Sequence, residues 1–197
     1  PVEIITSNIT HNGEDSVLDG DDYSVTLTPD ENYVLPDDIT VTIGENTVLT
    51  PDQYTYDPDT GAVTIPENLI TGEVIITAEA ELQKHPVSVG GTGIKNPTST
   101  EIVHNGKYEY TIEPEENYVL TDEITVTIGG NPLNREDFTY ENGKVTIPEN
   151  LITDKVVIEA AAIEKFPVEI ITSNITHNGE DSVLDGDDYS VTLTPDE

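Results

Sequence analysis

The chain has 197 residues, a formal net charge of −33 and no cysteine. The missing cysteines exclude disulfides, thiolate metal sites and a cysteine nucleophile. The acidity opposes binding to nucleic acid or to an anionic membrane surface. No apolar run approaches the roughly 18 residues that a membrane-spanning helix requires, so insertion into a membrane is not expected.

One long repeat organises the sequence. Residues Pro1 to Glu31 return letter for letter as Pro167 to Glu197. Within that period, residues 1–85 and 86–166 share the motifs Glu-Asn-Tyr-Val-Leu, Ile-Thr-Val-Thr-Ile-Gly and Thr-Ile-Pro-Glu-Asn-Leu-Ile-Thr. Repetition at a fixed spacing indicates an array of structural units. We therefore predict two related domains, 1–85 and 86–166, followed by 167–197, the first two strands of a repeated copy of the first domain.

The first domain reads as short strands separated by polar turns. Tyr23, Val25 and Leu27 alternate with polar residues, and this period of two is typical of a strand with one buried face. A loop rich in Asn, Gly and Asp, residues 10–22, precedes that strand. Residues 66–70 allow one helical or 3₁₀ turn at most. The predicted strands cover residues 2–9, 23–28, 39–43, 54–56, 62–65 and 73–82.

The second domain repeats this plan with different loops. Its strongest turn signal is Asn142-Gly143 in a predicted hairpin, and residues 98–107 replace the acidic 14–22 segment of the first domain. Shared strands with divergent loops are expected when one fold is used twice. About seven short strands in each domain predict an all-β chain of β-sandwich domains.

The junctions between the domains contain no flexible linker sequence. Residues 81–86 and 162–167 lead from a last strand to a first strand without a Gly or Ser run, and each junction ends in Pro. Proline fixes its own backbone and favours extended geometry in the preceding residue, here His85 and Phe166. We therefore expect the domains to be arranged end to end as a semi-rigid rod.

A longer pattern runs through the first domain: Tyr-x-Val-Thr-Leu-Thr-Pro, then Tyr-Val-Leu-Pro and Ile-Thr-Val-Thr-Ile-Gly, continuing through Tyr54-Thr-Tyr-Asp to Val74-Ile-Ile-Thr-Ala. This pattern resembles the tandem Ig-like repeats of extracellular and cell-surface proteins of Gram-positive bacteria, especially anaerobic gut bacteria. The likeness covers nearly the whole chain, and it implies Ig-like domains in an extracellular stalk or adhesin-like array. Its motifs are structural, so it implies no catalytic or ligand residues. The second domain departs from it at Thr121, where the first has Pro36.

The candidate metal site is the loop Asp19-Gly-Asp-Asp22. Asp19, Asp21 and Asp22 supply the oxygen ligands that Ca²⁺ prefers. The loop lacks the spacing and the terminal bidentate Glu of an EF-hand, and the second domain has His104-Asn-Gly-Lys107 in the aligned place. Calcium binding is therefore one interpretation of this loop, and a solvated turn is the plainer one. No other metal or cofactor is expected.

The sequence shows no constellation of catalytic residues. Paired carboxylates at 37–38, 115–116 and 122–123 fall in predicted turns, whereas a glycosidase needs two carboxylates held across a pocket. We therefore predict that the chain is not an enzyme. The histidines fall in predicted loops or junctions and are expected at the surface; they are His11, His85, His104 and His177.

Residues 167–197 would expose an apolar face and unpaired strand edges if they stood alone. One interpretation is that the sequence is a window on a longer array, because it begins and ends inside its repeat; export and anchoring signals would then lie elsewhere. The other is that 167–197 inserts into a second molecule in place of the identical Pro1–Glu31. Such strand exchange would propagate from head to tail.

Two functions remain open at this point. The first is structural: a repeat segment of a bacterial extracellular filament or surface adhesin stalk that supplies reach and stiffness, with neighbouring copies as partners. The alternative is a module that binds carbohydrate or a host protein through the 10–22 loop. Exposed aromatic residues clustered on one loop would favour the alternative, yet eight of the nine tyrosines fall in strand-like stretches.

Overall fold

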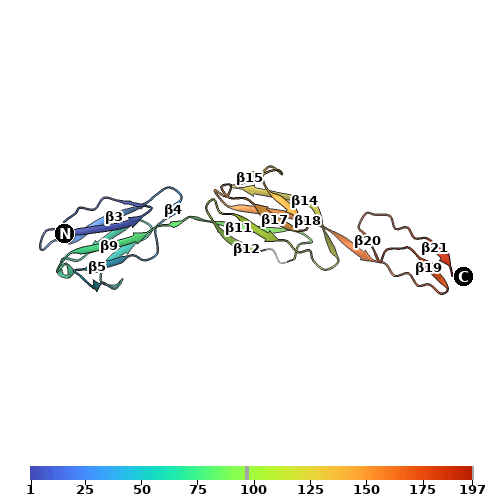
Figure 1. Ribbon diagram of the computed structural model, residues 1–197, viewed down its shortest axis with the longest axis horizontal. Helices are drawn as coiled ribbons and strands as arrows, with labels where there is room; N and C mark the ends of the chain where they lie inside the picture. The colour runs from blue at the N-terminus through green and yellow to red at the C-terminus, as the bar shows by residue number, and fades with distance from the viewer. Residues whose placement is uncertain (96–97, 197) are drawn as a thin grey trace. The chain divides into compact units, whose positions relative to one another are not determined.

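The computed structural model describes residues 1–95 and 98–196 (Figure 1). It divides into two compact units, Pro1–Gln83 and Lys84–Glu197. Both units are built from strands, and the described residues contain one short 3₁₀ helix, η1 (Glu67–Leu69), and no α-helix. The all-β class predicted from the alternation is therefore confirmed.

Two four-stranded sheets form most of the first unit. Its strands are β1 (Val2–Ser7), β2 (Ile9–His11), β3 (Tyr23–Pro29), β4 (Tyr33–Val34), β5 (Thr40–Ile43), β6 (Thr47–Val48), β7 (Thr55–Asp57), β8 (Ala62–Ile65), β9 (Val74–Glu79) and β10 (Glu81–Leu82). One sheet has the order β1-β9-β5-β6, with β1 parallel to β9, and the other has the order β2-β3-β8-β7. A short separate ladder joins β10 to β4.

The two sheets of the first unit share one hydrophobic core. From β3, Tyr23, Val25 and Leu27 are 3%, 4% and 1% exposed, so the alternation predicted the buried face of this strand correctly. From the other sheet, Val41 on β5 and Ile76 on β9 are fully buried in the same cluster. Two sheets that enclose one core give the unit a β-sandwich-like build.

The segment predicted as one strand, residues 2–9, forms two strands in different sheets. Asn8 lies between β1 and β2 with a φ of 56°, in the left-handed region that Asn enters more readily than most residues. This turn moves the chain from the sheet of β9 to the sheet of β3. The pattern of apolar residues gave no sign of the break, because Ile9 beyond it is buried in the same core.

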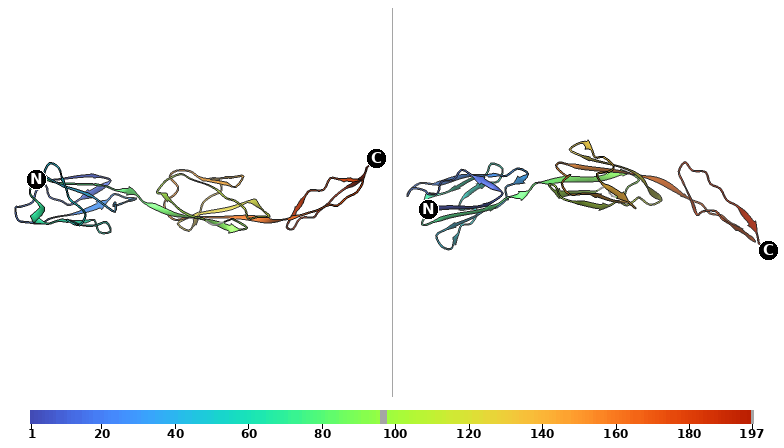
Figure 2. Two further views of the ribbon diagram at one scale, coloured as in Figure 1. Left: turned by 90° about the horizontal axis from the view of Figure 1, so that it is seen from below. Right: turned by 45° about the horizontal axis from the view of Figure 1, so that its top comes forward.

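The second unit shares much of this plan, and some of its strands are longer than those of the first unit. Its strands are β11 (Lys84–Thr92), β12 (Thr98–Val103), β13 (Tyr108–Thr111), β14 (Tyr118–Ile128), β15 (Asn131–Pro132), β16 (Thr139–Glu141), β17 (Lys144–Ile147), β18 (Val156–Pro167), β19 (Ile175–His177), β20 (Ser182–Leu184) and β21 (Leu193–Pro195). One sheet has the order β12-β11-β18-β14-β15, with β20 added on β18, and the ladder β13-β17-β16 forms another. Val87, Val145 and Ile158, drawn from both sheets, are fully buried in a second core, and the two layers can be followed in Figure 2.

Strand β14 is continuous where the first unit has a break. In the first unit, Pro36 follows β4 and separates it from β5, because proline has no N–H to donate to a ladder. In the second unit Thr121 takes that position, and β14 runs on through a register shift. Asp122 and Glu123 therefore lie within a strand, and the prediction that this carboxylate pair sits in a turn is wrong.

Residues 167–196 keep part of the fold of their identical counterparts. β19 pairs with β21 as β2 pairs with β3, and β20 pairs with β18. Their apolar side chains are far more open: Val191 and Leu193 are 39% and 52% exposed, against 4% and 1% for Val25 and Leu27. Within the described residues no strand pairs with this segment in the way that β8 pairs with β3.

Candidate functional site

The acidic loop, defined here as residues 12–22, is held at its start by the strand that follows it. The Asn12 side-chain oxygen accepts a hydrogen bond from the Thr26 amide at 2.7 Å, and the Tyr23 hydroxyl donates to the Glu14 carbonyl at 2.9 Å. Burial raises the pKa of Tyr23 above its ordinary value, and nearby acidic residues add to this shift. The hydroxyl therefore stays protonated at neutral pH and fixes the loop.

The three calcium candidates lie on the exposed part of the acidic loop. Asp22 Oδ1 accepts a hydrogen bond from the Glu67 amide at 2.8 Å, which ties the loop to η1. Asp19 and Asp21 are exposed to solvent. In the part of the chain that the structure describes, no group of three or more His, Asp or Glu side chains is placed to hold a metal ion. The three carboxylates are thus not brought together, and the two interpretations of this loop, a calcium site and a solvated turn, both stay predictions.

A cavity of about 310 Å³ opens beside the acidic loop. Its wall combines Leu18 and Asp19 from the loop with residues 70–73, which follow η1. Leu18 is 76% exposed. Ligand sites are mostly lined by apolar and aromatic side chains, and the described lining of this cavity contains no aromatic residue. The cavity therefore has no aromatic side chain on which a ligand ring could stack, and its distinguishing feature is the exposed side chain of Leu18.

A larger hollow of about 590 Å³ lies between the end of β3 and β4. Tyr33, Leu35 and Pro58 belong to its lining. Nearby, the Tyr56 hydroxyl donates to the Pro36 carbonyl at 2.8 Å, and burial together with neighbouring carboxylates raises the pKa of Tyr56 to about 12. A hydroxyl held in this way is a structural donor at neutral pH and does not act as a base.

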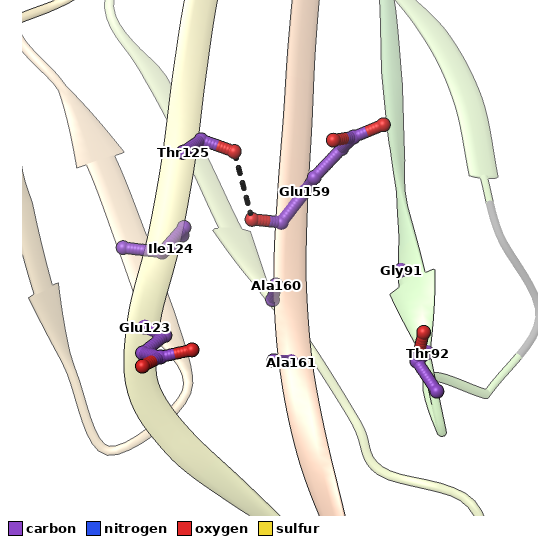
Figure 3. A pocket seen from close by; sticks show the side chains of 8 residues that line it. All are labelled: Gly91, Thr92, Glu123, Ile124, Thr125, Glu159, Ala160 and Ala161. Atoms are coloured by element: carbon purple, nitrogen blue, oxygen red, sulfur yellow. Dashed lines mark hydrogen bonds between the residues drawn. The ribbon is translucent and has the colours of Figure 1, made fainter.

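A shallow groove of about 350 Å³ crosses β11, β18 and β14 of the second unit (Figure 3). Its lining includes two carboxylates, Glu123 on β14 and Glu159 on β18, together with Gly91, Ala160 and Ala161. Catalysis by paired carboxylates needs a site that excludes water and gives the two groups different environments. An open groove with small side chains in its lining provides neither. That the chain is not an enzyme stays a prediction.

Two histidines are buried, so the prediction that all four lie at the surface is wrong. His85 on β11 and His104 in the turn after β12 are 5% and 9% exposed. His85 Nε2 and His104 Nδ1 lie 3.0 Å apart and share a hydrogen bond. Burial lowers the pKa of His85, His104 lowers it further, and Asp154 opposes the shift. His85 is therefore neutral at pH 7 and forms part of the structure of this unit.

Comparison of the two junctions in the sequence does not reveal this buried position. His85 precedes Pro86 as Phe166 precedes Pro167, so the junction holds an aromatic ring in both places. Phe166 is 42% exposed, although phenylalanine is among the residues most often buried, so the counterpart of His85 gives no sign of its burial. The partner His104 lies in a loop that differs between the domains, so comparison within the sequence offered no sign of it.

The exposed charges of the second unit form a small network around Glu109. Its carboxylate makes ion pairs with Lys107 at 2.6 Å and with Lys144 at 3.0 Å. Hydrogen bonds from these two lysines lower the pKa of Glu109 to about 2. Exposed ion pairs of this kind stabilise a fold only slightly, and the network has the composition of an ordinary solvated surface.

Comparison with known proteins found no match: no protein-family model, no curated protein and no solved structure resembles the chain closely enough to identify it. Over the residues that the structure describes, no helix is long and apolar enough to cross a membrane. The function must therefore be inferred from the geometry and from the internal repeat.

Proposed function

We propose that the chain is a structural repeat segment of a bacterial extracellular filament or surface adhesin stalk, in which Ig-like domains arranged end to end supply reach and stiffness. The extracellular location follows from the resemblance to tandem Ig-like repeats of Gram-positive surface proteins. The net charge of −33 fits this role, because strongly acidic neighbouring stalks repel one another and stay apart. The observation that carries the proposal is the strand pairing between β18 and β20.

Strand β18 connects the core of the second unit to the repeat that follows it. It begins at Val156 in that core and continues to Pro167, where the copy of the first repeat starts. Its last three residues pair with β20 in the register Lys165↔Leu184, Phe166↔Val183 and Pro167↔Ser182. Flexible connections are rich in Gly and Ser and lack hydrogen bonds. A connection made by a paired strand instead suits a stalk that must resist bending.

A similar arrangement occurs at the start of the second domain. β11 pairs with β12 in the register Lys84↔Val103, His85↔Ile102 and Pro86↔Glu101. The segment Lys-aromatic-Pro thus pairs with the following domain at both junctions. Only Gln83 separates β10 from β11, and the Gln83 amide donates to the Asn32 carbonyl at 2.9 Å. So short and well bonded a connector supports stiffness at this junction as well.

The alternative, binding of carbohydrate or a host protein through residues 10–22, has less support. The exposed Leu18 and the cavity beside it could hold an apolar group. In the repeated copy, however, the identical Leu184 lies in β20 and pairs with β18. The residues of this loop can therefore form a strand that pairs with a neighbouring strand. This pairing explains why the sequence has a leucine at position 18, and no ligand is needed to explain it.

Electron microscopy of chains that carry one, two and three tandem copies of residues 1–166 tests the proposal. We expect rods of constant width whose length grows in proportion to the number of copies. A matched control carries a Gly-Ser linker inserted after Gln83, which should introduce visible bends. Compact particles, or bends as frequent without the linker as with it, would contradict a role in reach and stiffness.

A further inference from the structure

The chain enters and leaves the second domain through two neighbouring strands. β11 begins at Lys84, directly after the last residue of the first unit, and β18 ends at Pro167, where the next repeat begins. The two strands are adjacent in the sheet order β12-β11-β18-β14, and Figure 3 shows the ribbon of β18 between those of β11 and β14. Tension along the chain is therefore applied to the start of β11 and to the end of β18.

The direction of these strands determines how such tension is distributed. β11 and β18 are parallel over six residue pairs, from Val87↔Val156 to Thr92↔Ala161. In a parallel pair the two strand starts lie side by side, so the pulled start of β11 and the pulled end of β18 lie at opposite ends of the ladder. Tension therefore pulls the strands past each other along their length. The evenly spaced hydrogen bonds of a parallel ladder then share the force, and the ladder has to give way as a whole.

The side chains of the same two strands fix their register. Val87, Val156 and Ile158 are fully buried in the core of the second unit. Because successive side chains point to opposite faces of a strand, a slip of one residue would turn these groups out of the core. Sliding the strands past each other thus requires the loss of apolar packing in addition to the loss of the ladder.

Both strands are also held from their other side. β12 pairs with β11 in a register that includes Val87↔Thr100 and Val89↔Thr98. β14 pairs with β18 over eight residue pairs. The two strands that receive the tension are therefore interior strands of the sheet, and neither can be peeled from an edge.

We propose that the second domain bears tension along the chain, and that the parallel ladder between β11 and β18 is the element that resists it. The inference rests on the proposed function, because a stalk held at one end and pulled at the other is stretched along its chain. It adds resistance to stretching to the reach and stiffness already proposed. The first unit has the same arrangement, since β1 is parallel to β9 over six residue pairs, from Val2↔Val74 to Ser7↔Glu79.

Single-molecule pulling on the full chain through engineered cysteines tests the proposal. The chain has no cysteine of its own, so force can be applied at two chosen residues. The test variant is Lys84→Cys with Lys165→Cys, which pulls the start of β11 and the end of β18 as the chain itself does. The matched control is Lys84→Cys with Lys155→Cys, which pulls the starts of both strands and opens the ladder pair by pair. All three lysines are exposed, so the core is unchanged in both variants.

The two pulling directions should give different forces on the same fold. At equal loading rates, we expect a mean unfolding force at least about twofold higher for the test variant, because its ladder yields as a whole and forced unfolding follows the unfolding rate. Each event should release up to roughly 3.6 Å of chain for every residue between the two cysteines, which identifies the second domain as the part that unfolded. Equal midpoints of thermal unfolding show that the two variants are equally stable without force.

The first unit supplies a second pair of variants, which decides the matter where the lysine variants do not fold. Pro1→Cys with Gln83→Cys pulls the start of β1 and the chain just beyond the end of β9, and Pro1→Cys with Glu73→Cys pulls the starts of both strands. The first variant of this pair should again require the higher force.

A control force as high as the test force would overturn the proposal, because resistance would then not depend on pulling the parallel strands along their length. Such a result leaves the rod lengths measured by electron microscopy unaffected. Failure of the tension-bearing role and failure of the stalk function can therefore be told apart.

Discussion

At the scale of single residues, asparagine occupies many of the turn positions of this chain. Among the described residues, every non-glycine residue with positive φ is an asparagine. The left-handed region costs most L-residues about 1–2 kcal/mol, and Asn tolerates it better than most because its short amide can hydrogen-bond locally. Asn32 and Asn117, at matching positions of the two domains, have φ of 68° and 65°. The repeats therefore share turn chemistry as well as strand pattern.

Gly61 is a position where a side chain has no room. It has a φ of 72°, and an added Cβ would lie 1.9 Å from the Leu27 carbonyl oxygen. Gly61 also accepts a hydrogen bond from the Leu27 amide at 2.9 Å, so β3 would have to move. We expect Gly61→Ala to lower the free energy of unfolding by about 3 kcal/mol or more, the scale of a disrupted core position. Urea unfolding of the full chain, followed by circular dichroism, measures this loss.

Gly44 provides the matched control for Gly61. It has a φ of 62°, yet nothing lies within 4 Å of an added Cβ. Gly44→Ala should therefore show the cost of backbone conformation alone, about 1–2 kcal/mol. Equal losses for the two variants would mean that the close approach to Leu27 contributes nothing.

The buried histidine pair should make the second unit sensitive to mild acid. Burial and His104 lower the pKa of His85 below its ordinary value of about 6.5. Below about pH 6.5 the unfolded chain therefore binds a proton at His85 that the folded unit does not bind. The contribution of neutral His85 to the free energy of unfolding is complete above that pH and is lost as the pH falls. One such proton changes the free energy of unfolding by up to about 1.4 kcal/mol per pH unit. Hydrogen exchange of β11 amides at pH 7.5 and 5.0 measures the effect, which should exceed that of β1 amides.

A phenylalanine at the buried histidine position separates this effect from general acidity. Phe166 occupies the matching junction position, so His85→Phe keeps an aromatic ring while it removes one titrating group. It leaves His104 without its ring partner, so the informative quantity is the pH slope rather than the absolute stability. A variant slope as steep as that of the parent chain would show that His85 is not the source.

At the scale of elements, one residue decides whether a strand continues. Thr121 Oγ1 donates to the Ala161 carbonyl at 3.1 Å and accepts a hydrogen bond from the Glu123 amide at 3.2 Å. Pro36 occupies the same place in the first unit. Its side chain can make neither hydrogen bond, and the ladder ends there because proline has no backbone N–H to donate. We expect Thr121→Pro to cost at least about 1–2 kcal/mol, because it removes two hydrogen bonds of roughly 0.5–1.5 kcal/mol each and also the backbone N–H at this position. Hydrogen exchange of amides 119–124 should quicken, whereas the amide of Val126 should be unchanged.

A valine at the same position distinguishes the hydroxyl from the backbone. Thr121→Val retains the branched shape that strands favour and removes only the hydrogen bonds. Its loss should be smaller than that of the proline variant. If valine proved as costly as proline, the continuity of β14 would depend on the hydroxyl and not on the missing proline ring.

The sequence predicted the strands better than it predicted their ends and partners. Alternation identified the buried face of β3 because period two follows directly from the pleat of a strand. It missed the turn at Asn8, since both sides of that turn bury apolar residues in one core. It also placed Asp122 in a turn, because an acidic pair usually signals one. The candidate calcium loop was correctly located between strands, whereas the contact of His85 with His104 joins residues distant in sequence, which no local pattern encodes.

At the scale of the whole molecule, negative charge is distributed very unevenly. Residues 1–83 contain 18 acidic side chains and no Lys or Arg. Among the described residues, the ion pairs between acidic side chains and Lys95, Lys107 and Lys144 all belong to the second unit. Like charges without compensation oppose the compact state, and dissolved salt screens them within about 10 Å at 0.1 M. Any added cation should therefore stabilise the first unit whether or not it occupies a site.

Calcium must accordingly be compared with magnesium at equal ionic strength. A calcium site occupied at about 100 times its dissociation constant would stabilise the fold by about 2.7 kcal/mol. Asp19, Asp21 and Asp22 do not form a group that could hold a metal ion, so we expect thermal unfolding in 10 mM CaCl₂ and in 10 mM MgCl₂ to have the same midpoint. The variant Asp19→Asn with Asp21→Asn and Asp22→Asn should change both midpoints equally, through charge alone. A calcium-specific rise that this variant abolishes would reverse the conclusion. Because Asp185, Asp187 and Asp188 repeat the loop, substituting them should then remove any part of the rise that comes from residues 167–196.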